Sequence, residues 1–111
     1  MQSKYFNRKT LYNGKIYDSK KEAKRAYELE MLQRAGIISN LEKQKKFELQ
    51  PSFKVNNKTI RQITYIADFY YYDNQKQYWV VEDTKGFKTD TYKIKYKLFL
   101  YKYPDIVFIE S

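Results

Sequence analysis

The sequence contains no cysteine and no histidine, and each absence removes a class of chemistry. Without cysteine there are neither disulfides nor thiolate metal sites. Without histidine, zinc-hydrolase sites, Ser-His-Asp triads and imidazole acid–base catalysis are excluded. Any catalysis must therefore use carboxylates, lysine, tyrosine or a metal ion held by oxygen ligands, for which Mg2+ (or Mn2+) is the expected ion.

Glycine and proline are scarce, with three Gly and two Pro in 111 residues, which favours long regular elements joined by few turns. A chain of this length has room for one domain. No apolar run approaches the ~20 residues of a membrane span. The first nine residues are charged and no apolar stretch follows them, unlike a signal peptide. We therefore expect a cytoplasmic protein with no membrane partner.

Acidic side chains are outnumbered, 13 against 22 basic ones, and the formal net charge is +9. Such a surface favours a polyphosphate partner, because neutralising phosphates releases counterions. Solubility alone, or an anionic membrane surface, is the alternative explanation. The 13 Tyr and 7 Phe are expected to fill the core and line strands, with stacking on unpaired bases as a second possibility.

Residues 1–17 are basic and predict an N-terminal arm or a short hairpin around an Asn-Gly turn. Ser19 and Glu22 have the spacing of a capping box, which predicts the start of a helix over about residues 20–35. Gly36 is a natural stop for that helix.

Strand patterns dominate the middle of the chain. Residues 47–55 alternate apolar and polar side chains around Pro51, which interrupts the strand. Residues 59–72 and 78–81 are rich in β-branched and aromatic side chains and predict an antiparallel hairpin. Residues 105–110 predict a short strand buried in the sheet.

A second helix is predicted over about residues 90–101, capped by Thr89 or Asp90 and ended by Pro104. Its apolar stripe is expected to be Tyr92, Ile94, Leu98, Phe99 and Tyr101. Its basic face is expected to be Lys93, Lys95, Lys97 and Lys102. The whole pattern predicts a mixed α/β domain over residues 1–111.

Two acidic side chains interrupt the apolar runs of the predicted hairpin, although Asp is depleted in strands. Asp83 and Lys85 are two residues apart and share a strand face. A hairpin loop of two or four residues places Asp68 opposite Val81 or Asp83, on that same face. A loop of three residues would instead place Glu82 beside Asp68 and leave Lys85 on the far side.

The first arrangement gathers two carboxylates and an ammonium group. Asp68 and Asp83 would repel each other unless a cation neutralised them, and a divalent ion bound by oxygens does so. Such an ion polarises a phosphodiester and lowers the pKa of its bound water. Lys85 could orient that water and offset charge developing on the phosphoryl group.

Asp68, and then Asp83 and Lys85 after a strand, resemble the signature of the PD-(D/E)XK nuclease superfamily. Ala67 stands where the motif names proline, a position that carries no ligand. The order of helix, strands, helix and strand resembles the restriction-endonuclease-like αβββαβ core, a mixed central sheet flanked by two helices.

The resemblance extends over nearly the whole chain. Residues 17–23, 63–69 and 82–87 are similar to a family of small phage and prophage proteins that is placed in this superfamily beside resolvase- and transposase-type endonucleases. It implies a metal-dependent DNA endonuclease in the cytoplasm of a bacterial host. Its substrate would be double-stranded or branched DNA, as for a Holliday-junction resolvase, in phage replication, recombination or packaging.

The resemblance also implies roles for individual residues. Mg2+ (or Mn2+) would be held by Asp68, Asp83 and the backbone carbonyl of Thr84, with Glu22 helping directly or through water. Lys85 would position the attacking water, and hydrolysis would leave a 5′-phosphate. A homodimer is implied as well, because junction-cutting enzymes need two active sites.

Gln44 resembles a polar residue near the site of resolvase-like members. The side chains assigned to DNA contact are Lys43, Gln44, Lys45, Lys46, Lys88, Lys93 and Lys97. The lysines at 43–46 and those at 93–97 could equally be solvent-exposed side chains that contact no DNA.

Purely structural explanations remain open for the site residues too. Asp83 and Lys85 could form a cross-strand ion pair at a sheet edge, and Asp68 could be a hydrogen-bonded structural acid. The capping box explains Glu22 without catalysis, and Glu82 is expected to be an outward-facing acid. The rival function is a non-catalytic protein that binds nucleic acid or another protein on a nuclease scaffold.

Overall fold

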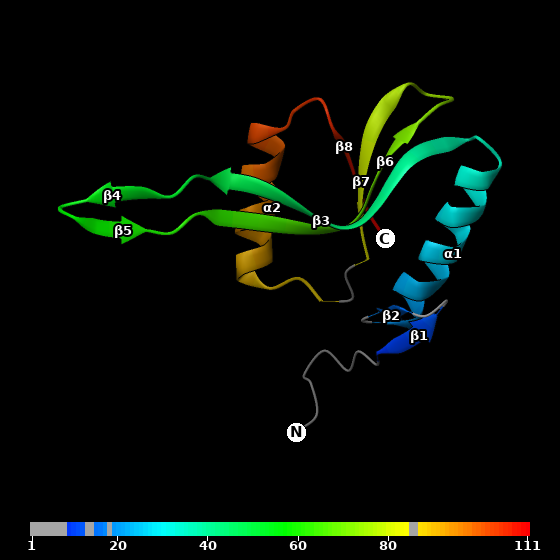
Figure 1. Cartoon of the computed structure of the whole chain (residues 1–111), viewed down its shortest axis with the longest axis horizontal. Coiled ribbons are helices and arrows are strands. Elements are labelled where there is room, and N and C mark those ends of the chain that lie inside the picture. Colours follow the sequence, from blue (N-terminus) through cyan, green and yellow to red (C-terminus); the bar gives the residue numbers. More distant parts are fainter. Residues whose placement is uncertain (1–8, 13–14, 18, 85–86) are drawn as a thin grey trace.

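Figure 1 shows the computed structural model of the chain, which describes residues 9–12, 15–17, 19–84 and 87–111. The elements follow in the order β1 (Thr10–Tyr12), β2 (Lys15–Tyr17), α1 (Lys20–Arg34), β3 (Ile38–Gln50), β4 (Phe53–Val55), β5 (Lys58–Ile60), β6 (Ile63–Asp73), β7 (Tyr78–Asp83), α2 (Asp90–Lys102) and β8 (Val107–Glu110). The predicted mixed α/β fold, with two helices and a mixed central sheet, is confirmed.

The central sheet has four strands in the order β3-β6-β7-β8. β6 pairs antiparallel with β3 on one side and with β7 on the other, whereas β8 pairs parallel with β7. The strand over residues 105–110 was predicted to be buried, and this is wrong. It lies at the edge of the sheet, where its last residues are exposed.

The two helices cover opposite faces of β7. Val80 packs in a core with α1, and the next residue, Val81, packs in a second core with α2. Successive strand residues point to opposite faces, so β7 lies between the helices. The end of β7 is therefore shielded from solvent on both sides.

α1 forms where the sequence predicts it. The Ser19 hydroxyl accepts a hydrogen bond of 3.1 Å from the Glu22 backbone N–H, which caps the first turn. Gly36 follows the helix with φ +76°, a conformation that favours glycine. Ala23, Ala26 and Leu29 are buried along one face, against the sheet.

α2 begins at the predicted Thr89 cap, but its predicted apolar stripe is largely wrong. Only Tyr92 and Phe99 of that stripe are buried, whereas Ile94 and Tyr101 are 61% and 88% exposed. The buried side follows i, i+4 and i+7 spacing, which includes Tyr96 instead. No helix in the described part of the chain is long and apolar enough to cross a membrane.

The N-terminal hairpin of β1 and β2 agrees with the prediction, although its turn at residues 13–14 lies outside the described residues. A second hairpin differs from the prediction. The expected strand over 59–72 is broken after Ile60, so that β4 and β5 pair separately around Asn56 and Asn57. Figure 1 shows this hairpin projecting from the end of β3 and β6, well away from α1.

Candidate active site at the end of strand β7

The register of β6 and β7 decides which acidic side chains meet. The strands are joined by four residues, 74–77, and pair Tyr70 with Val81 and Phe69 with Glu82. Beyond the Phe69–Glu82 pair, the Asp68 backbone N–H donates to the Asp83 carboxylate, so these two acidic residues are neighbours across the strands. This is the four-residue-loop arrangement from the sequence, and it excludes the three-residue alternative.

Asp83 is fully buried at the end of β7, a central strand. Its Oδ1 accepts a 3.2 Å hydrogen bond from the Asp68 backbone N–H, and its Oδ2 accepts one from the Tyr65 hydroxyl. Its backbone carbonyl accepts a 3.0 Å bond from the N–H of Ser111, just past β8. β7 is not an edge strand, so Asp83 does not lie at a sheet edge. Lys85, its partner in the ion pair considered from the sequence, lies outside the described residues.

Tyr65 is a site residue that sequence reasoning missed. Burial raises the pKa of its phenol well above the ordinary value, and the negative charge of Asp83 raises it further. Tyr65 therefore stays protonated and donates to the carboxylate. Its signal in the sequence was weak, because it is one tyrosine among the 13 and aromatic side chains are common in strands.

Asp68 is held from two directions. Its Oδ2 accepts 2.8 and 2.9 Å hydrogen bonds from the backbone N–H and hydroxyl of Thr84. Its Oδ1 lies 3.5 Å from the amide nitrogen of Gln44, on β3. These donors fix the orientation of a carboxylate that is 7% exposed. Hydrogen bonding alone could account for Asp68, so the structural alternative for this residue is still open.

Gln44 connects the sheet to α1. The same amide nitrogen that contacts Asp68 lies 3.1 Å from Oε2 of Glu22. Glu22 is 4% exposed, so its carboxylate points inward although its backbone N–H serves the helix cap. The cap and the site are therefore compatible roles for this residue, carried by different atoms.

The backbone of Gln44 has φ +55°, in the left-handed region that disfavours side chains other than glycine. Such a conformation costs on the order of 1–2 kcal/mol and is concentrated at functional sites. Here it aims the Gln44 side chain between two buried carboxylates. The strain supports a role for this position.

Glu82 lies on the opposite face of β7 from Asp83, as expected, but the prediction that it faces outward is wrong. It is 1% exposed, because α1 covers that face. Both carboxylate oxygens accept 2.7 Å hydrogen bonds from the Arg25 guanidinium, and the Tyr71 hydroxyl donates a further one. The hydrogen bond to Glu82 raises the pKa of Arg25 above its already high ordinary value, so the guanidinium stays charged.

Metal-binding geometry is incomplete among the described side chains. In the part of the chain that the structure describes, no three Asp or Glu residues are close enough together to hold a metal ion by themselves. Asp68, Asp83 and Glu22 are linked through Gln44 and the β6 backbone rather than clustered around one point. Lys85, the predicted catalytic lysine, lies outside the described residues.

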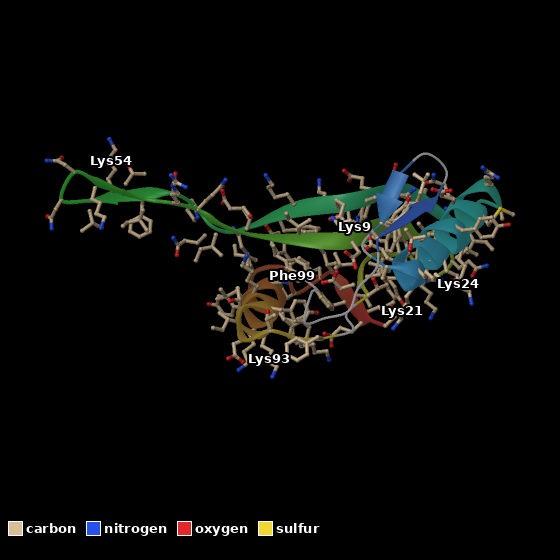
Figure 2. All side chains as sticks on the ribbon, turned by 90° about the horizontal axis from the view of Figure 1, so that it is seen from below. Lys9, Lys21, Lys24, Lys54, Lys93 and Phe99 are labelled. Carbon is tan, nitrogen blue, oxygen red and sulfur yellow. The ribbon has the colours of Figure 1, made fainter. Side chains whose placement is uncertain are left out.

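The lysines assigned to DNA contact do not form one track. Lys43 donates to Tyr17 and Glu30; burial lowers its pKa, but these two bonds outweigh that and raise it. Figure 2 shows Lys93 below α2, on the other side of the molecule from the β3–β6 ribbon.

Other lysines are paired near their own elements. Lys45 lies 3.6 Å from Glu42 and over the ring of Tyr70, and Lys88 lies 3.3 Å from Glu110. Lys46 and Lys97 are exposed. Contact with DNA thus remains a prediction for exposed lysines on separate surfaces.

The family described as "Protein of unknown function (DUF1064)" matches residues 2–109, so the chain belongs to this family. No curated protein and no solved structure matches the chain.

Proposed function

We propose that this member of the DUF1064 family is a divalent-metal-dependent nuclease that hydrolyses phosphodiester bonds in DNA. The observation that carries the proposal is the contact between Asp68 and the Asp83 carboxylate on neighbouring strands, with Glu22 linked to Asp68 through Gln44. Neighbouring buried carboxylates repel one another, so a bound cation would stabilise Asp68 and Asp83 in this arrangement. The resemblance to PD-(D/E)XK nucleases supports the same reading.

The donor set suits magnesium or manganese, because every candidate ligand is an oxygen. Asp68, Asp83, the carbonyl of Thr84 and Glu22 would hold the ion. Each carboxylate offers about four lone-pair sites, so the hydrogen bonds described above leave capacity for a metal. When bound, the ion supplies Lewis acidity toward a phosphodiester oxygen and makes a water more acidic.

The chain's own residues prepare that site. The Tyr65 hydroxyl and the Asp68 backbone fix Asp83, and Thr84 fixes Asp68. Ligands that are already fixed need not reorganise during the reaction. This preorganisation accounts for much of the electrostatic stabilisation of a transition state by an enzyme. Lys85 is proposed to orient the attacking water and to offset charge on the phosphoryl group.

Cleavage assays test the proposal directly. The protein is incubated with supercoiled, linear, single-stranded and four-way-junction DNA, with Mg2+, Mn2+ or chelator. We expect metal-dependent cleavage that falls by ~10² or more in Asp83→Asn and Lys85→Ala, because each removes a ligand or a charge-stabilising donor. Cleavage that persists in chelator, or in Asp83→Asn, would show that the activity comes from elsewhere.

Thermal melts give a second readout that does not need activity. Metal should raise the midpoint of the wild type by binding the folded state, and Asp83→Asn should lose most of that shift. Ca2+ serves as a control ion that binds oxygen ligands with looser geometry. A melting midpoint that is unchanged by Mg2+, Mn2+ and Ca2+ would argue against a metal site.

A binding protein on the same scaffold is the second candidate. The full burial of Asp83, with both of its oxygens already accepting hydrogen bonds, is the observation that favours it. In that case the carboxylates would be structural, DNA would bind with and without metal, and no DNA form would be cut. The cleavage and melting experiments separate the two functions.

A further inference from the structure

The hairpin of β4 and β5, with its flanking residues 51–62, forms an arm that projects from the body (Figure 1). Its turn, Asn56 and Asn57, has φ of +49° and +65°, the pattern of the tight turns that suit twisted hairpins. Neither hydrophobic core includes a residue of the arm. An isolated two-stranded hairpin is marginally stable in water, so the arm depends on the continuation of β3 and β6.

All charged side chains of the arm are basic. Lys54, Lys58 and Arg61 are all exposed, and no acidic residue occurs anywhere from residue 49 to residue 67. A projecting element whose charged side chains are all basic is repelled by the rest of its own chain, because the net charge is +9. It is complementary to a polyanion.

One lysine of the arm, Lys54, lies on the same side of the molecule as Lys46 of the sheet. Figure 2 shows Lys54 on the side of the arm that faces away from α2. On β3, Phe47 packs on Phe99 of α2, so the neighbouring Lys46 points to the opposite side and is exposed. Lys46 and Lys54 therefore lie along the same side of β3 and of the arm that extends from it.

The span from Gln44 to Lys54 is at most about one repeat of duplex DNA. Lys54 is ten residues beyond Gln44 in sequence, which at ~3.3 Å per residue is at most ~33 Å along the strand. One turn of B-form DNA is about 34–36 Å. A duplex at the carboxylate site could thus present its backbone to the arm about one turn away.

The opposite face of the arm is apolar and favours the same partner over a second copy of the chain. Phe53 and Val55 are nearly half exposed there, and Lys58 stands opposite Val55 on that same face. Packing two arms through this face would bring their Lys58 side chains together. A duplex offers both phosphates for Lys58 and base edges or sugars for apolar side chains.

We infer that the arm is a β-ribbon that binds the backbone of duplex DNA about one turn from the carboxylate site. This rests on the proposed function in taking DNA as the partner, but it requires no cleavage. The principal phosphate contacts are Lys54 on one face of the arm and Lys58 on the other.

Binding of a ~30-bp duplex, measured by fluorescence anisotropy in chelator at several salt concentrations, tests the inference. The double variant Lys54→Ala, Lys58→Ala should bind on the order of tenfold more weakly near physiological salt. The slope of log K against log salt should become shallower by about 2, because each phosphate that a lysine neutralises adds about 0.9 to it. The matched control is Arg34→Ala, Lys76→Ala, two exposed cations at the end of α1 and in the turn between β6 and β7, with little change expected. Figure 1 shows both elements away from the arm.

Removing the arm keeps the test independent of single side chains. Gln50 pairs with Ile63, so an Asn-Gly turn can replace residues 51–62 and close β3 onto β6. The armless protein should fold, because both cores are intact, and should bind the duplex at least as weakly as the double variant. Unchanged affinity in either variant would overturn the inference.

Sedimentation equilibrium addresses the rival occupant. If the wild type is a dimer, the armless protein a monomer and the DNA affinity unchanged, the arm joins two copies and the inference is wrong. Cleavage separates the inference from the proposed function. A wild type that binds through the arm and never cuts DNA would refute the nuclease, not the arm.

Discussion

Glu82 and Asp83 are adjacent acids with opposite expected effects, because they lie on opposite faces of β7. Glu82→Gln removes the charge that pairs with Arg25 and places an amide N–H toward donors of Arg25 and Tyr71. Breaking a buried ion pair costs ~3–5 kcal/mol. The Arg25 side chain is 31% exposed, so solvent screens part of this and we expect a loss of about 2–4 kcal/mol.

Asp83→Asn should behave in the opposite way. The asparagine can still accept from the Asp68 N–H, and its amide can donate to the Tyr65 oxygen. One negative charge is also removed from a group of buried carboxylates. We expect stability to change by less than ~1 kcal/mol while cleavage is lost.

Urea denaturation and thermal melts measure both effects, with Glu28→Gln as the matched control. Glu28 also contacts Arg25, at 3.1 Å, but its side chain is 44% exposed, and such surface pairs contribute ~0–1 kcal/mol. Glu82→Gln should lower the midpoint by roughly 10 °C and Glu28→Gln by little. Below its midpoint, Glu82→Gln should keep a cleavage rate within a few fold of the wild type.

Equal melting of Glu82→Gln and Glu28→Gln would refute this expectation, since the buried pair would then contribute nothing. Unfolding of Asp83→Asn as easily as Glu82→Gln would refute it equally. In that case Asp83 would be a structural acid rather than a ligand.

Two further predictions concern alkaline pH and the backbone of β3. Burial first, and neighbouring carboxylates second, raise the pKa values of Tyr65, Tyr71 and Tyr92 above the ordinary ~10. Because the folded pKa values are the higher ones, their stabilisation is complete below pH ~10. Above that pH the free energy of unfolding should fall by ~1.4 kcal/mol per pH unit for each tyrosine. Urea melts at pH 9–11 should show a shallower fall in Tyr65→Phe than in the wild type. An equal fall in the two proteins would refute the raised pKa of Tyr65. Gln44→Gly should relieve the left-handed backbone, so stability should hold or rise by up to ~1 kcal/mol while cleavage falls. Asn40→Gly is its control at φ +57°, and equal cleavage in the two variants would show that the Gln44 side chain is dispensable.

The sequence alone determined the elements that local chemistry specifies. Ser19 and Gly36 bracket α1, because a hydroxyl cap and a positive-φ stop act within a few residues. The turn after β6 limited the hairpin to a few registers, and two of these placed Asp68 on the Asp83 face. The candidate carboxylates could therefore be named before any packing was known.

Only the tertiary structure decided what surrounds those carboxylates. Alternation along β7 separates Glu82 from Asp83, but it does not say that α1 buries the Glu82 face. Tyr65 and Gln44 reach the site through strand pairing and a left-handed backbone, neither of which leaves a clear periodic signal. Nor could periodicity find the true stripe of α2, because its apolar residues lie nearly all round the helix. Long-range packing makes these choices, since it depends on which faces meet and not on which residues are neighbours in sequence.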